Sequence, residues 1–322
     1  MSHNSELDTL AREIVRQHSH LALQANPLQR LPMDLTALPT LLTATMTQAV
    51  YAACCALDFI DADAQCVASA WQRQSERSGH FDANAWPTDP QDFGQLKSTL
   101  QRATNDSGFD SFAPCPHQLG LYAVLPDATW VGRMARAGVP TVQLRFKSDD
   151  PGAIKREVQA AVQAVQGTGA LLFINDHWQA AIEAGAYGVH LGQEDLQSAE
   201  LEPIRAADLR LGVSSHGYAE MLRAAAVQPS YIALGAVYAT TLKRMATPPQ
   251  GPARLKMYAT LLRNTPTVAI GGIDAARLPE VLASGVGSVA VVRALVAADA
   301  PEAQVTSLQA MFTCRTPHRL AE

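Results

Sequence analysis

The stretch LLFINDHWQAAIEAGAYGVHLGQ (171–193) decides the fold, because it sets two short apolar runs, LLFIND and GVHLGQ, on either side of a helical segment. The other apolar runs with this spacing are LYAVL (121–125), TVQLRF (141–146), RLGVSSH (210–216), YIALGAV (231–237), TVAIGG (267–272) and SVAVVRAL (288–295). Continuous apolar strands separated by helices are typical of a parallel sheet that is buried on both faces. Eight such units predict an α/β fold, a closed (β/α)8 TIM barrel. An open doubly wound sheet needs a glycine-rich turn after its first strand, and LYAVLPDATW has none.

The first 105 residues show helical periodicity instead. One helical face carries the apolar residues Leu7, Leu10, Ala11, Ile14 and Val15. Ser5 followed by Asp8 resembles a capping box at the start of this helix. We expect three more helices at about 38–58, 62–76 and 92–104. His18, His20 and His80 are isolated in the sequence, and we expect them at surface or capping positions.

A linker separates the two parts of the chain. The stretch NDSGFDSFAPCPHQLG (105–120) is rich in turn-forming residues. Residues 1–115 hold 7 Lys/Arg and 13 Asp/Glu, a balance of −6, whereas the whole chain carries −5, so the remainder carries +1. We therefore predict a mainly helical N-terminal domain of unknown role over 1–115 and a barrel domain over 116–322.

Composition excludes several classes of protein. A net charge of −5 argues against nucleic-acid binding, which needs a basic surface. No apolar run approaches the roughly 20 residues that span a bilayer. The N-terminus MSHNSELDTL lacks the apolar core of a signal peptide. The 5 cysteines show no CxxC spacing, which favours a reducing cytoplasm over a zinc site or disulfides. The sequence leaves a homo-oligomer open.

Polar and charged side chains lie on the second predicted strand and at the ends of the third and fourth, where the active site of such a barrel lies. Gln143, Arg145 and Lys147 alternate with apolar residues and so share one face. Two adjacent cations need a compensating anion. Asp176 and Asp195 reach the same rim, and two carboxylates beside these cations suit a Mg²⁺ ion that carries a diphosphate. The alternative for Asp176 is capping of the following helix, which leaves Asp195 unexplained.

The later strands end in residues that suit a second phosphate. Ser214 has no acidic partner at triad spacing, so we interpret it as a hydrogen-bond donor rather than a nucleophile. The loop after the sixth strand carries Thr240, Thr241 and Lys243 and is long enough to cover a substrate. Gly271-Gly272 and Val292-Arg293 follow strands seven and eight, the usual phosphate site of TIM barrels.

These motifs together resemble the thiamine phosphate synthase family over about 116–315. The resemblance is carried, in order, by QLRFK (143–147), IND (174–176), GVHLGQEDL (188–196), LGVSSH (211–216), YIALGAVY (231–238), Lys243 in its loop and VAIGGI (268–273). It implies an enzyme that joins hydroxymethylpyrimidine diphosphate to thiazole phosphate, with Mg²⁺ as cofactor, and releases pyrophosphate. The implied mechanism is dissociative: the C–O bond to pyrophosphate breaks before the thiazole nitrogen attacks.

The resemblance also implies residue roles. Asp176 and Asp195 bind Mg²⁺, while Arg145, Lys147 and Lys243 act on the leaving group. The pyrimidine diphosphate contacts Gln143, Arg145, Lys147, Asn175 and Ser214. The thiazole phosphate contacts Thr240, Gly271 and Val292.

Two residues depart from the family pattern. Leu242 replaces a threonine before the loop lysine, and Arg293 replaces a serine after the last strand. Our hypothesis is that Arg293 reaches the thiazole phosphate, since a charged donor bonds roughly twice as strongly as a neutral one. The alternatives are a thiazole tautomerase-like isomerase, which retention of Asp176 and Asp195 disfavours, and a non-catalytic sensor of thiamine precursors.

Overall fold

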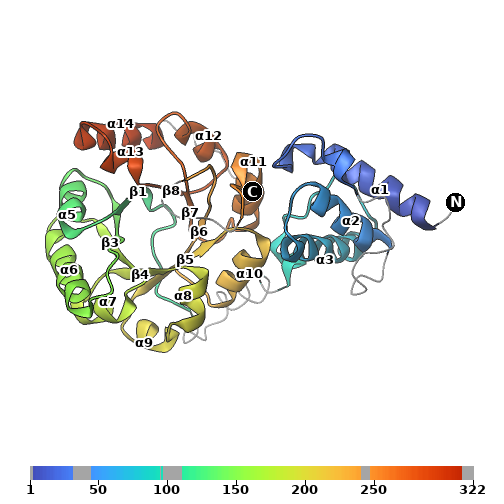
Figure 1. The fold of residues 1–322 in the computed structure, drawn as a ribbon. Helices are drawn as coiled ribbons and strands as arrows, with labels where there is room; N and C mark the ends of the chain where they lie inside the picture. The colour runs from blue at the N-terminus through green and yellow to red at the C-terminus, as the bar shows by residue number, and fades with distance from the viewer. Residues whose placement is uncertain (1–2, 32–44, 95, 97–110, 241–246, 314–322) are drawn as a thin grey trace.

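A computed structural model describes residues 3–31, 45–94, 96, 111–240 and 247–313. Eight parallel strands close into a barrel, because each pairs with the next and the first pairs with the last (Figure 1). The strands are β1 (Gly120–Leu125), β2 (Thr141–Leu144), β3 (Leu171–Asn175), β4 (Gly188–Leu191), β5 (Arg210–Ser215), β6 (Tyr231–Leu234), β7 (Thr267–Ile270) and β8 (Ser288–Val291). The predicted TIM barrel is therefore confirmed.

Helices surround the barrel and cover the outer face of its strands (Figure 1). They are α5 (Ala128–Arg136), α6 (Pro151–Ala164), α7 (Trp178–Ala184), α8 (Gln193–Ser198), α9 (Leu201–Ala206), α10 (Tyr218–Ala226), α11 (Gly251–Leu261), α12 (Leu278–Ala283), α13 (Arg293–Val296) and α14 (Pro301–Thr313). Short polar side chains start some of them. Asp127 accepts from Trp130 N at 2.8 Å at the start of α5, and Asp150 accepts from Gly152 N at 2.8 Å at the start of α6.

The strands end earlier than the sequence predicted. The predicted strand 141–146 ends at Leu144, so Arg145 and Lys147 lie in the loop that follows. The predicted strand 288–295 ends at Val291, and Arg293 is the first residue of α13. Apolar residues such as Phe146 and Leu295 continue past the strands because they pack in the core under the helices, and the apolar pattern alone therefore overstates strand length.

Alternate strand residues fill the barrel interior. Tyr122, Phe173 and Tyr231 pack there with smaller apolar side chains. Their rings need space, and a Cβ at Gly212 would overlap the ring of Tyr231. Residues of the opposite strand face, such as Val142, Leu172 and Val189, join the apolar core under the helices.

The N-terminal region consists of helices and 3-10 turns. They are α1 (His3–Gln17), η1 (Ser19–Leu21), η2 (Pro27–Arg30), α2 (Thr45–Ala56), α3 (Asp61–Ser78) and η4 (Pro90–Phe93). The predicted apolar face of α1 is confirmed, since Leu7, Ala11, Ile14 and Val15 are buried. The helix begins at His3, so the capping box expected at Ser5 is wrong. Most of the helix expected at 92–104 lies outside the described residues.

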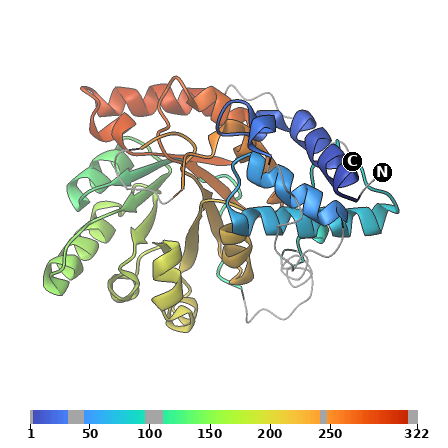
Figure 2. The ribbon, with the colours of Figure 1, turned by 45° about the vertical axis from the view of Figure 1, so that its right-hand side comes forward.

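The N-terminal helices and the barrel share one apolar core. The same buried cluster contains Ile14 and Trp71 from the helices and Tyr218 and Leu255 from the barrel. Figures 1 and 2 show α1 to α3 on one side of the barrel, beside α10 and α11. The division into domains at residue 115 stays a prediction.

His18 lies inside this core, which corrects the expectation of a surface or capping position. Its side chain is buried between Trp71 and Trp86, with ring centroids 5.7 and 5.1 Å away. Nε2 lies 2.9 Å from the carbonyl oxygen of Ala83, so this nitrogen carries the hydrogen and donates. Burial lowers the pKa of His18. Sequence spacing around one histidine does not show such long-range packing.

We expect the buried His18 to make stability pH-dependent. Its pKa is lower in the folded state than the unfolded value of 6.5, so the unfolded chain binds the proton more readily. The free energy of unfolding should therefore fall as the pH drops below about 6.5. His18→Phe should weaken this dependence, at a cost of about 1 kcal/mol at neutral pH for the lost hydrogen bond. Urea denaturation of both proteins between pH 5 and about pH 8 measures the difference, and parallel pH profiles would contradict it.

Candidate active site

Polar side chains line the barrel interior near the carboxyl ends of the strands, and hydrogen bonds join them in one chain. Gln143 Nε2 donates to Asn175 Oδ1 at 2.8 Å, and Tyr122 OH donates to Gln143 Oε1 at 2.9 Å. The hydroxyls of Tyr122 and Tyr231 lie 2.8 Å apart. His190 Nδ1 lies 2.8 Å from Tyr231 OH, and His190 Nε2 lies 2.8 Å from Ser214 Oγ. These hydrogen bonds thus connect predicted substrate contacts on β2, β3 and β5.

The direction of each bond follows from the single hydrogen that a hydroxyl carries. Tyr122 gives its hydrogen to Gln143, so Tyr231 must donate to Tyr122. Tyr231 then has no hydrogen left for His190, so Nδ1 of His190 carries a hydrogen and donates. A neutral His190 therefore accepts at Nε2 from Ser214 Oγ. The predicted donor role of Ser214 towards a phosphate thus requires either a protonated His190 or a turned hydroxyl.

The second group of polar residues contains the two predicted metal ligands. Lys147 Nζ lies 2.7 Å from Asp176 Oδ2. Asp195 is hydrogen-bonded to Asp176, and burial and then the charge of the Asp176 carboxylate raise the pKa of Asp195. Asp176 has a left-handed backbone with φ of 64°, which aspartate tolerates better than most residues. The N-cap of α7 is His177, not Asp176, so capping does not account for Asp176.

Arg145 lies on the same rim, just after β2. It is half-buried, and among the described residues its guanidinium has no hydrogen bond or ion pair. Within the same part of the chain, no three His, Cys, Asp or Glu side chains gather as a complete metal site. The structure therefore brings the carboxylates of Asp176 and Asp195 together with Lys147, and Arg145 lies in the same loop as Lys147, just after β2.

The carboxyl ends of β6 and β7 form a different surface, made mostly of backbone. Gly271 and Gly272 have φ of 105° and 65°. A Cβ at Gly271 would lie 2.6 Å from Cα of Ala236, so only glycine allows the close approach of the segment after β6. Val237 N donates to Ile270 O, and Tyr238 N donates to Gly271 O, each at 2.9 Å.

The remaining predicted contacts lie around this glycine pair or outside the described residues. Thr240 is half-buried, Val292 is the N-cap of α13, and Arg293 is exposed in its first turn. Thr241, Leu242 and Lys243 lie outside the described residues. The structure also adds Tyr122 and Tyr231, which the sequence reading treated as ordinary strand residues. Their hydroxyls at inward strand positions were the available signal.

The comparisons with known proteins identify the family of this chain. The sequence profile of the thiamine monophosphate synthase family matches residues 121–295, more than half of the chain. The chain belongs to this family. A thiamine-phosphate synthase from Neisseria gonorrhoeae is 54% identical over 202 residues, which make up 63% of this chain and 98% of that protein. One from Cronobacter sakazakii is 52% identical over 184 residues, 57% of this chain and 88% of that protein.

A solved structure supports the same assignment. Thiamine phosphate pyrophosphorylase from Pyrococcus furiosus matches with a TM-score of 0.54 at 26% identity, over 61% of this chain and 96% of that chain. The protein is therefore an enzyme of the thiamine monophosphate synthase family, a transferase of thiamine biosynthesis. Among the described helices none is long and apolar enough to cross a membrane.

Tyr231→Phe tests the buried chain of hydrogen bonds. The change removes one hydroxyl, so Tyr122 OH loses the donor and His190 Nδ1 loses the acceptor that Tyr231 supplies in the barrel interior. We expect a loss of about 1–3 kcal/mol in the free energy of unfolding. Tyr187→Phe is the control, because Tyr187 is only half-buried before β4, and it should change stability by less than about 0.5 kcal/mol. Equal losses of stability for the two variants in urea denaturation would show that this buried series of hydrogen bonds contributes nothing specific to the free energy of unfolding.

Proposed function

We propose that the enzyme condenses hydroxymethylpyrimidine diphosphate with thiazole phosphate to give thiamine phosphate and pyrophosphate. The observation that carries this proposal is the ion pair between Asp176 and Lys147, with the Asp195 carboxylate close to Asp176 and the buried amide pair of Gln143 and Asn175 on β2 and β3. A diphosphate needs cations, and a heteroaromatic ring needs fixed hydrogen-bond partners. Both lie within β2 to β5 and the loops that follow them.

The amide pair suits the pyrimidine ring. Gln143 gives an amide hydrogen to Asn175 and takes one from Tyr122, so its orientation is fixed at both ends. The carbonyl oxygen of Asn175 is occupied, which leaves its amide N–H groups to donate to a ring nitrogen. Preorganised donors of this kind hold the reacting carbon in place without reorganisation during the reaction.

The two carboxylates suit Mg²⁺, which binds proteins through one or two carboxylates and shares substrate phosphate oxygens. Asp176 and Asp195 would hold the ion, beside the ammonium group of Lys147, which lies 2.7 Å from Asp176 Oδ2. When bound, Mg²⁺ supplies charge stabilisation to the diphosphate.

The residues then act mainly on the leaving group. As the C–O bond breaks, negative charge grows on pyrophosphate, and Arg145, Lys147 and Lys243 stabilise that state more than the bound substrate. The carbocation left on the pyrimidine is attacked by the thiazole nitrogen. The glycine pair at Gly271-Gly272, with Thr240 and Val292, would hold the phosphate of that second substrate. The reaction needs no protein nucleophile.

Pyrophosphate release from purified protein tests the proposed function. With both substrates and Mg²⁺, the protein should release pyrophosphate and form thiamine phosphate in equal amounts. Isomerisation of a thiazole phosphate without Mg²⁺ would instead favour the tautomerase alternative. Binding of either precursor without turnover would favour the sensor.

The metal pair has its own test. Asp176→Asn and Asp195→Asn should each lower kcat by about 100-fold or more, because each removes a ligand. Mg²⁺ affinity of the unaltered protein should weaken as the pH falls through the raised pKa of Asp195, since the ion needs the ionised carboxylate. The control is Asp150→Asn, an exposed acid that caps α6. Full activity in excess chelator would contradict the metal role.

Arg293→Ala tests the second substrate site. If the exposed guanidinium grips the thiazole phosphate, KM for that substrate should rise about tenfold, in keeping with the loss of a charge-assisted hydrogen bond. KM for the pyrimidine diphosphate should barely move. Arg133→Ala is the control, because Arg133 is an exposed arginine that pairs with Glu302 on the outside of the barrel. Equal effects on both substrates, or none, would show that Arg293 points into solvent.

A further inference from the structure

The N-terminal helices contact the barrel at the two helices that follow β5 and β6. Figures 1 and 2 show α1 to α3 beside α10 and α11, away from α5 to α7. The helices of a TIM barrel begin near the carboxyl ends of its strands, on the catalytic side. The N-terminal region is therefore placed beside one half of the active-site rim.

The contact with α10 is made at the start of that helix. Asp63, on α3, is buried, and its carboxylate accepts from Ala219 N at 2.8 Å. The N-cap of α10 is Gly217, which has no side chain to cap the helix. A Cβ there would overlap the Asp63 carboxylate. Asp63 thus supplies from the N-terminal region the acceptor that a helix N-terminus needs.

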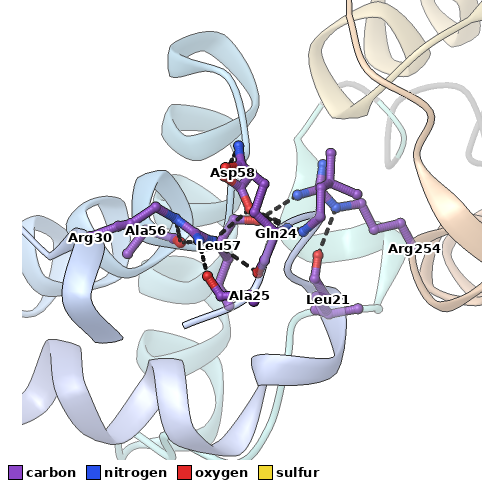
Figure 3. Close-up of polar contacts among 9 residues, drawn as sticks. Leu21, Gln24, Ala25, Arg30, Ala56, Leu57, Asp58 and Arg254 are labelled. Atoms are coloured by element: carbon purple, nitrogen blue, oxygen red, sulfur yellow. Dashed lines mark hydrogen bonds and ion pairs between the residues drawn. The ribbon is translucent and has the colours of Figure 1, made fainter. Parts of the chain in front are cut away.

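The contact with α11 is made by a buried cation, Arg254 (Figure 3). Its side chain is 2% exposed. Nε donates to Leu21 O at 2.9 Å, and one terminal nitrogen donates to Leu57 O at 2.6 Å. The guanidinium carbon lies 3.7 Å from the ring centroid of Phe59. Because burying an unpaired charge is costly, these carbonyls and this ring are what allow Arg254 to stay in the interface.

Arg254 also donates to Gln250, which lies at the end of the segment between β6 and α11. The other terminal nitrogen of Arg254 donates to Gln250 Oε1 at 3.0 Å, and Tyr258 OH donates to the same oxygen at 3.1 Å. Gln250 Nε2 donates to Pro248 O at 2.8 Å. Its backbone N donates to Ala236 O at 2.8 Å. Gln250 therefore ties the downstream end of this segment to its upstream end.

The upstream end of the segment between β6 and α11 is in turn hydrogen-bonded to the end of β7 and to the first glycine of the pair. Gly251 N donates to Val237 O at 2.9 Å, and Val237 and Tyr238 donate to Ile270 and Gly271. Residues 20–23 of the N-terminal region face residues 237–239 and 249–253 across a pocket of about 390 Å³. A series of hydrogen bonds, joined by the short backbone stretches 250–251 and 236–238, thus connects Leu21 and Leu57 to Gly271.

We propose that the N-terminal region is part of the catalytic unit, in which Arg254 and Gln250 are positioning residues for the second substrate site. By fixing both ends of the segment after β6, they hold Ala236 to Tyr238 against Gly271. This inference rests on the proposed function, because it assigns the glycine pair to the thiazole phosphate. The pyrimidine side, on β2 to β5, lies outside this series of bonds.

Two variants and a matched control test the proposal in the full chain. Arg254→Lys keeps the charge but loses the forked guanidinium that donates to Leu21, Leu57 and Gln250. Gln250→Ala removes the side chain that accepts from Arg254 on the barrel side of the contact. Arg30→Ala is the control, because Arg30 also donates to carbonyl oxygens, those of Ala25 and Ala56, and pairs with Asp58 (Figure 3). All of these partners belong to the N-terminal region.

The first readout is the KM for each substrate. We expect both variants to raise KM for thiazole phosphate about tenfold while KM for the pyrimidine diphosphate stays within about twofold. In the double variant, KM for thiazole phosphate should be no higher than in the more severe single variant, since both changes break the same series of hydrogen bonds. Arg30→Ala should leave both constants unchanged. Equal rises for both substrates, or none, would overturn the proposal.

The second readout does not need activity. The backbone N–H groups of Val237, Tyr238, Gln250 and Gly251 are hydrogen-bonded, and we expect their exchange with deuterium to be faster in both variants than in the Arg30→Ala control. Unchanged exchange would refute the link between the N-terminal region and the segment after β6. Faster exchange in a protein that releases no pyrophosphate would keep the link and contradict the proposed function instead.

Discussion

The hydrogen bonds in the interior of the barrel depend on the hydroxyl of Tyr231. It accepts from His190 and donates to Tyr122, and so joins β4 and β5 to β1, β2 and β3 through the centre of the barrel. A buried hydroxyl with one hydrogen gives the whole chain of bonds a single direction. Gln143 and Ser214 are held in their orientations by that direction. Gly212 makes the arrangement feasible, because a side chain there would displace the Tyr231 ring.

Arg254 imposes a second constraint, because a buried guanidinium needs acceptors from somewhere. Two of its three acceptors are the carbonyl groups of Leu21 and Leu57, so the barrel of this chain depends on the N-terminal region for most of the pairing of one of its own side chains. The family does not require such a region, since a 202-residue alignment already covers 98% of the gonococcal relative. The interface is therefore a property of this chain, added to a barrel that is complete as a fold.

The sequence predicted the barrel well, because eight continuous apolar runs with helical segments between them leave few other folds. It predicted strand ends poorly, since residues such as Phe146 stay half-buried after the strand has ended. It identified the Asp176 and Lys147 pair from their places after neighbouring strands. It missed Tyr122 and Tyr231, because a tyrosine in an apolar run looks like ordinary core. It also missed the burial of His18 and Arg254, because the backbone carbonyls that pair with them, those of Ala83, Leu21 and Leu57, lie 65 or more residues away and leave no local pattern.

The two halves of the site are supported in different ways. The proposed pyrimidine side consists of side chains that the strands, or the residues just after them, place directly, such as Gln143 and Asn175. The proposed phosphate side consists largely of backbone around Gly271 and the segment after β6, whose position depends on what packs behind it. A strand holds its own side chains rigidly, whereas a loop needs outside support to place a backbone amide with the same accuracy. Under the proposal made here, that difference is why an added region hydrogen-bonded to α11 would act on the glycine side of the barrel rather than on the carboxylate side.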